Sequence, residues 1–248
     1  MNTLTESFLT ALRLIAALDS GLLTIVGRSL AVSLTACAIA CLIGLFLGGW
    51  LAVCRFAGRG IVLTLLNTSL ALPSVVVGLI VYLLLSRSGP LGFLGWLFSF
   101  KAMVLAQAVL VLPIIIALTR QAIEDAERNH GEQLRSLGSG TFIRSVLLMV
   151  DERFSLLTIV ITGFGRAVSE VGAVMVVGGN IEGYTRVMTT SIALETSKGD
   201  LPLALALGIV LLAVVLGLNT LVALLRRWRE RADAQPSGRM PGIEGALG

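Results

Sequence analysis

Two ionisable residues lie inside an otherwise apolar run, and their types and spacing could handle an anion. Arg166 and Glu170 are four positions apart, with Ser169 between them. On one helix, residues four apart share a face and can form an ion pair. A charge at mid-bilayer depth costs roughly 3 kcal/mol, so such a pair must face a partner helix or water. It either locks helix packing or lines a route on which Arg166 meets an oxyanion while Glu170 orients the guanidinium.

A second group of hydroxyl and basic side chains follows this run, after a helix expected to end near residue 180. The group comprises Thr185, Arg186, Thr189 and Thr190. Hydroxyls and one guanidinium suit a tetrahedral oxyanion, or contact with an external delivery protein at an outer gate. The same residue types are equally typical of a wetted outer loop. Both interpretations stay open at this point.

A polar, charged island spans residues 124–150 between apolar runs. Gly138 and Gly140 permit a tight break between two short helices, because glycine reaches backbone angles that other residues avoid. Apolar side chains recur in the island at helical spacing. This pattern is typical of a solvent-side helical hairpin that docks a soluble partner, or of an ordinary amphipathic loop. The residues expected to carry docking are Glu132, Leu134, Leu137, Gly138 and Phe142.

Several chemistries are excluded by what the sequence lacks. The lysines are Lys101 and Lys198, and neither follows a glycine-rich phosphate loop, so we expect no nucleotide site and no enzyme activity in this chain. The one histidine, His130, lies in the polar island, which disfavours a histidine-based catalytic centre. The three cysteines at positions 37, 41 and 54 have no clustered His or carboxylate companions, so we interpret them as small apolar fillers and expect no metal site. We also expect no nucleic-acid partner.

The composition places most of the chain in lipid. Of its 248 residues 56% are apolar and 14% are charged, and the mean hydropathy is +0.92, well outside the range of soluble domains. We expect an all-α integral membrane protein with five transmembrane helices and an N-terminal interfacial amphipathic helix. The expected spans cover residues 30–53, 61–85, 102–118, 154–177 and 203–225.

Local features refine these spans. Pro73 and Pro113 each remove a backbone donor and should kink their helices. Gly44 and Gly48 have the small-residue spacing that lets two helices approach closely. The apolar piece within residues 86–101 is too short and too rich in glycine to cross the bilayer, so we expect an interfacial lip.

The distribution of basic residues predicts the orientation. Twelve of the nineteen Lys and Arg residues fall on the side of the polar island and C-terminus, and six fall on the other side. The island and the C-terminus are therefore expected in the cytoplasm, and the N-terminus outside. We divide the chain into an interfacial segment (1–21), one membrane domain (22–228) and a disordered cytoplasmic tail (229–248).

The polar island resembles the "EAA loop" of binding-protein-dependent ABC importer permeases. Glu132 and Gly138 match that motif in type and spacing, whereas Gln133 and Leu134 replace its two alanines and 150–151 (Val-Asp) replace its Leu-Pro. The likeness extends from about Leu22 to Leu225. The segments 72–78, 84–92, 163–173, 178–181 and 184–190 are similar to the tungstate-type permeases of the molybdate, tungstate and sulfate importer group.

This resemblance implies the type I ABC importer fold, with a cytoplasmic coupling helix around Gly138. It implies a multi-pass protein of the prokaryotic inner membrane, two copies of which sit on two cytoplasmic ATPases that hold ATP and magnesium. An extracytoplasmic binding protein would present the oxyanion, most closely tungstate, with molybdate and sulfate as related cargo. No cofactor is expected in this chain.

Two other functions remain open from the residues alone. One is a proton-coupled secondary anion transporter in which Glu170 titrates, although no inverted repeat is visible in the sequence. The other is a membrane scaffold that transports nothing, in which Arg166 and Glu170 only hold helices together. Uptake that stops when a companion ATPase is disabled would separate the importer from both.

Overall fold

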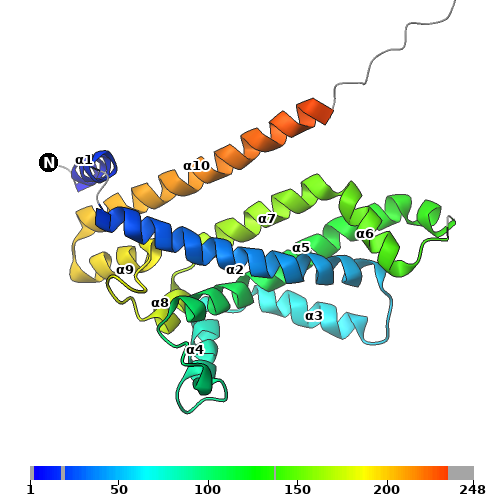
Figure 1. Ribbon diagram of the computed structural model, residues 1–248, viewed down its shortest axis with the longest axis horizontal. Coiled ribbons are helices and arrows are strands. Elements are labelled where there is room, and N and C mark those ends of the chain that lie inside the picture. The colour runs from blue at the N-terminus through cyan, green and yellow to red at the C-terminus, as the bar shows by residue number, and fades with distance from the viewer. Residues whose placement is uncertain (1–2, 18–19, 137, 234–248) are drawn as a thin grey trace, which may run out of the picture.

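The computed structural model describes residues 3–17, 20–136 and 138–233, and these residues form helices and connecting turns with no strand (Figure 1). This confirms the all-α integral membrane class. In chain order the elements are α1 (Thr3–Ala16), α2 (Ser20–Val53), α3 (Arg59–Leu70), α4 (Ser74–Leu85), the 3-10 turn η1 (Gly92–Leu94), α5 (Phe100–Ser136), α6 (Thr141–Asp151), α7 (Arg153–Val168), α8 (Gly172–Gly178), α9 (Met188–Lys198) and α10 (Leu201–Asp233).

Two continuous helices, α2 and α5, are long and apolar enough to cross a bilayer. Two further spans form if each bent pair, α3 with α4 and α7 with α8, counts as one crossing. The apolar part of α10, Leu201–Gly217, is shorter than a full span among the described residues. The predicted count of five spans is therefore not confirmed by length and composition.

The two long helices pack closely because α2 presents glycines to α5. A Cβ atom on Gly44 would lie 2.7 Å from Cγ2 of Ile115, and one on Gly48 would lie 2.7 Å from Cβ of Thr119. Both α5 side chains are fully buried in this contact. Gly163 of α7 approaches Ile115 from another side, with a hypothetical Cβ–Cδ1 distance of 2.5 Å. The small-residue spacing predicted a close helix contact, and the structure confirms it.

The two prolines have different effects. Pro73 separates α3 from α4, whose axes differ by 104°, so the predicted kink is confirmed as a full break. Pro113 lies inside α5, which continues as one helix through it. α4 turns away from the long helices and packs on α8, where a Cβ on Gly78 would lie 2.7 Å from Cα of Ala173 (Figure 1).

The two ends of the bundle are built differently. α6 and the last turns of α5 gather with the start of α3 at one end, and α1 and α9 lie with the start of α10 at the other (Figure 1). The predicted interfacial lip contains only the turn η1 as helix, as expected for a piece that does not cross. α1 confirms the predicted N-terminal helix. α10 runs to Asp233 and so extends into the predicted tail, of which residues 234–248 lie outside the described part.

Candidate functional site

The Arg166–Glu170 region is a break in a bent helix pair rather than one face of a continuous helix. α7 ends at Val168 and α8 begins at Gly172, with their axes 56° apart. The prediction of one unbroken helix over residues 154–177 is wrong for this reason. The regular pattern stops in residues 169–171: the N–H of Ser169 still bonds to Gly165 at 3.3 Å, whereas the N–H of Glu170 bonds to Ala167 at 3.2 Å. The remaining polar groups at the two helix ends need partners from elsewhere.

The carboxylate of Glu170 accepts hydrogen bonds from both sides of the break. Its Oε2 atom accepts from Nη1 of Arg166 at 2.7 Å, and its Oε1 atom accepts from the main-chain N–H of Ala173 at 3.1 Å. The predicted ion pair is therefore present, and the carboxylate also caps the first turn of α8. The exposure of the two side chains differs, since Glu170 is 3% exposed and Arg166 is 37% exposed.

Gln107 of α5 contributes to the break, although it is not among the site residues predicted from the sequence. Its Nε2 atom donates to the carbonyl oxygen of Ala167 at 2.9 Å, one residue before α7 ends. The side chain is 3% exposed, and its Oε1 atom has no hydrogen-bond partner. A buried amide within an apolar span was the available signal, because such a group requires a partner. The sequence does not say which of the many backbone groups that partner is.

The predicted outer hydroxyls are buried and bonded within the chain. Thr189 donates from Oγ1 to the carbonyl of Glu170 at 2.9 Å and so ties α9 to the break. Thr185 accepts from the N–H of Ile181, and Thr190 accepts from the N–H of Val187. These hydroxyls hold the loop after α8 in shape, and they do not form an exposed polar surface in this conformation. Ser169, in contrast, is exposed beside Arg166.

A second basic residue organises the loop after α8. Arg28 of α2 donates from Nη2 to the carbonyl of Gly183 at 2.7 Å. Arg186 lies 3.4 Å from the Glu182 carboxylate, which is 84% exposed. Tyr184 is also exposed, so residues 181–184 present the accessible part of this loop. Arg28 therefore supports this loop through its hydrogen bonds to the carbonyls of Gly183 and Arg186.

The opposite end of α5 carries a network of ion pairs. Glu127 accepts from Nη2 of Arg135 at 2.7 Å and lies 3.1 Å from Nε of Arg144 on α6. A Cβ on Gly131 would lie 2.7 Å from the Glu127 carboxyl carbon, so a side chain here would displace this carboxylate from its present position. The network joins the last turns of α5 to α6. Glu124 makes a comparable link between Arg59 and Arg120.

The predicted docking residues lie around this network. Glu132 is exposed near the end of α5, so the first of the two short helices we predicted is the continuation of a long one. Gly138 has φ +75°, which confirms the predicted tight turn. Leu134 packs against the apolar cluster that contains Val53, Ile123 and Leu148. Phe142 is exposed on α6. Leu137 lies outside the described residues.

The geometry of the break suits transient contact with an anion. Glu170 neutralises Arg166 from the buried side, which leaves the exposed side of the guanidinium with free donor capacity. The paired carboxylate weakens the attraction of Arg166 for an anion, because its negative charge offsets the positive charge of the guanidinium. Among the residues that the structure describes, no group of three or more His, Cys, Asp or Glu could hold a metal ion.

Comparison with known proteins gives consistent relatives over most of the chain. It is 40% identical to the tungstate uptake system permease protein TupB of Peptoclostridium acidaminophilum over 226 residues, which cover 90% of this chain and 97% of that protein. It is 44% identical to the TupB protein of Campylobacter jejuni over 66% of this chain and 68% of that protein. The molybdenum transport system permease protein ModB of Escherichia coli is 29% identical over 79% and 88% of the two chains. No protein-family model matches the chain.

Proposed function

The chain belongs to the permease family of ABC transporters for oxyanions, and we propose that it imports tungstate, with molybdate next in preference. The observation that carries this proposal is the end-to-end match to a tungstate uptake permease. We further propose that the oxyanion arrives on an extracytoplasmic binding protein. A separate ATPase chain then hydrolyses ATP with magnesium, since a permease of this kind is not itself an enzyme.

In this proposal the break between α7 and α8 lines the route of the anion. Arg166 offers guanidinium donors on its exposed side, and Ser169 adds an exposed hydroxyl beside it. A doubly charged tetrahedral oxyanion would accept hydrogen bonds from the guanidinium. The Ser169 hydroxyl donates to the Arg166 carbonyl at 3.1 Å in this structure, so it would have to turn from that carbonyl to donate to the anion as well. Glu170 stays buried, paired and bonded to the start of α8, so it orients Arg166 without meeting the anion.

Helix α5 connects this route with the proposed ATPase contact. Gln107 bonds to the end of α7, and Glu132 lies twenty-five residues further along the same continuous helix, about 37 Å away at 1.5 Å per residue. A displacement of α5 at its Glu132 end would therefore be transmitted along this one helix to the break between α7 and α8. The ion pair between Glu127 and Arg144 fixes α6 to α5. The exposed Phe142 and the turn at Gly138 would therefore move together with α5.

Two exposed surfaces of the chain are the proposed contacts for the binding protein and for a second copy of the chain. The exposed loop residues 181–184, with Arg186 behind them, are the proposed contact for the binding protein. α3 has no buried residue, and one side of α4 exposes Val75, Leu79 and Leu83. We propose that a second copy of the chain covers these apolar faces. The Gly138 end would face the cytoplasm, with the N-terminus outside.

Isotope-labelled tungstate uptake in cells that express this chain with its cognate ATPase and binding protein tests the proposal. Uptake should depend on the chain and should stop when the phosphate-loop lysine of the ATPase is replaced. Excess unlabelled molybdate should compete less well than tungstate, and sulfate least. Uptake that persists without ATP hydrolysis and collapses with a protonophore would instead indicate the proton-coupled transporter. Uptake that is independent of the chain would indicate a scaffold.

A further inference from the structure

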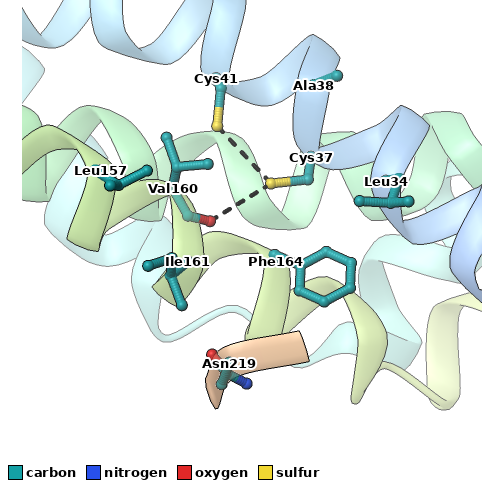
Figure 2. Close-up of a pocket in the computed structure, with 9 residues that line it drawn as sticks. All are labelled: Leu34, Cys37, Ala38, Cys41, Leu157, Val160, Ile161, Phe164 and Asn219. Atoms are coloured by element: carbon teal, nitrogen blue, oxygen red, sulfur yellow. Dashed lines mark hydrogen bonds between the residues drawn. The ribbon is translucent and has the colours of Figure 1, made fainter. Parts of the chain in front are cut away.

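A partly open cavity lies between α2, α7 and α10, and its α7 wall reaches Phe164, two residues before Arg166 (Figure 2). Its volume is about 300 Å³. An apolar protein cavity of about 150 Å³ is large enough to bind benzene, so this one admits an aromatic ring with a substituent. Its lining is apolar apart from the cysteines and one amide: Leu34, Cys37, Ala38, Cys41, Leu157, Val160, Ile161, Phe164 and Asn219.

Two thiols form part of the cavity wall. Cys37 and Cys41 are one turn apart on α2, and their Sγ atoms are 3.8 Å from each other (Figure 2). Both are free cysteines, and Cys37 also lies 3.7 Å from the carbonyl oxygen of Val160. Two sulfur atoms this close on one helix can ligate a single thiophilic atom, because thiols prefer soft centres. The side-chain nitrogen of Asn219 donates to the carbonyl of Val215 within α10.

We propose that this cavity is a binding site for a trivalent arylarsenical, in which Cys37 and Cys41 hold the arsenic and the aryl group fills the apolar space. In the hydrated reagent, arsenic carries one aryl group and two hydroxyls. Two S–As bonds form, two As–O bonds break, and each hydroxyl leaves as water with one thiol proton. Arsenic stays trivalent, so the step needs no oxidant or reductant.

The surroundings favour this class of ligand over a metal cation. A monovalent cation held by two thiolates would leave a net negative charge with no counter-ion among the lining residues, and a buried unpaired charge is strongly disfavoured. Two thiolates cancel the charge of Zn²⁺, but zinc takes four ligands, and no group of three or more His, Cys, Asp or Glu that could hold a metal ion occurs among the described residues. The bis-thiolate of an arylarsenical carries no charge. Its aryl group would contact Leu157, Ile161 and Phe164 and gain from leaving water. The pair of thiols suits the arsenic atom and the apolar space suits the aryl group, so both features favour an arylarsenical.

Intact-mass measurement of the purified full-length chain with phenylarsine oxide tests the site. We expect one phenylarsenic group to replace two hydrogens per chain. The adduct should survive a wash with excess mercaptoethanol and be released by dimercaptopropanol, because only a dithiol competes with two-point attachment. Heat unfolding of the labelled chain should shift upwards, since the ligand binds the folded state. A chain that takes up no arsenical, or releases it to mercaptoethanol, would overturn the proposal.

Matched variants identify the site. Cys37→Ser and Cys41→Ser should each abolish the wash-resistant adduct, and Cys54→Ser, which removes the thiol outside the cavity, should retain it. Ala38→Leu should slow labelling by phenylarsine oxide about tenfold by filling the cavity, yet leave labelling by the smaller methyl analogue unchanged. Retention of the adduct in Cys37→Ser, or its loss in Cys54→Ser, would contradict the assignment. Unchanged elution on size exclusion verifies that each variant is folded.

Discussion

The side-chain amide of Gln107 donates to the main-chain carbonyl of Ala167 at 2.9 Å, which fixes the long helix α5 to the last turn of α7. The Ala167 carbonyl also accepts from the N–H of Glu170 at 3.2 Å. Both donors act at the C-terminal end of α7, beside the proposed anion route. The break is therefore a defined structure with its own hydrogen bonds.

Removing the Gln107 donor should loosen this structure. Gln107→Met keeps the approximate volume, and the loss of one partly compensated hydrogen bond should lower the free energy of unfolding by about 1 kcal/mol. Gln107→Glu should cost more, because an ionised carboxylate cannot donate to the Ala167 carbonyl and would be buried. Thermal unfolding in detergent measures both, with Gln121→Met at an exposed position of the same helix as control. Equal stability of Gln107→Glu and the unmodified protein would show that the bond is unimportant.

The sequence predicted those structural features that are determined by residues close together in the chain. Pro73 broke its helix as expected, the Gly44 and Gly48 spacing predicted a close contact with another helix, and Gly138 has the positive φ that the turn required. The structure identifies that other helix as α5. The pairing of Arg166 with Glu170 was also predictable, because four residues separate them. In each case the physical reason lies within a few residues of the position concerned.

The sequence could not predict the break between α7 and α8, because its partners are distant. Gln107 is 60 residues from Ala167, and Thr189 is 19 residues from Glu170. No proline or long polar run marks residues 169–171, so local patterns favour one continuous helix there. The same limit hid the role of Arg28, which reaches the carbonyl of Gly183 across 155 residues.

A methyl group at Gly78 should separate α4 from α8. The added Cβ would lie 2.7 Å from the backbone Cα of Ala173, and backbone cannot move aside as a flexible side chain can. We expect Gly78→Ala to destabilise the protein by about 1–3 kcal/mol through overpacking. Gly208→Ala on α10 is the matched control, since nothing lies within 4 Å of its added Cβ. That control should be neutral or slightly stabilising in the same unfolding measurement.

Thiol labelling in intact cells tests the orientation. With the three native cysteines replaced, a cysteine introduced at the exposed position Glu182 should react with a membrane-impermeant reagent. A cysteine introduced at His130, also exposed in the structure, should react only after the cells are opened. Thr190 is fully buried and would be a poor reporter of the same loop. The reverse labelling pattern would invert the proposed topology.

The turn at Gly138 should be needed for coupling to the ATPase. Gly138 has φ +75°, and a β-branched residue there costs about 1–2 kcal/mol in backbone strain. Gly138→Val should still insert in the membrane but lose transport-stimulated ATP hydrolysis. Gly140→Val is the matched control, because Gly140 has φ −66° and both glycines have open space around them. Normal coupling in Gly138→Val, or equal loss in both variants, would remove the assignment of the coupling turn.

Replacing Arg166 and Glu170 together distinguishes a transport role from a packing role. Arg166→Ala alone leaves the Glu170 carboxylate buried and without its cation, so the protein should assemble poorly. Arg166→Met with Glu170→Gln removes both charges, and the glutamine oxygen can still accept from the N–H of Ala173. This double variant should recover normal assembly, as judged by its elution with the ATPase.

Transport by the same double variant then decides between the roles. If the pair only holds α7 and α8 together, oxyanion uptake should return along with assembly. We expect uptake to stay defective, because the exposed donors of Arg166 are gone from the proposed route. Arg166→Lys should keep part of the uptake, since the positive charge remains while the planar donor fork is lost. Because Glu170 is buried and Arg166 is the accessible partner, charge at position 166 should govern uptake, while an acceptor at position 170 should govern assembly.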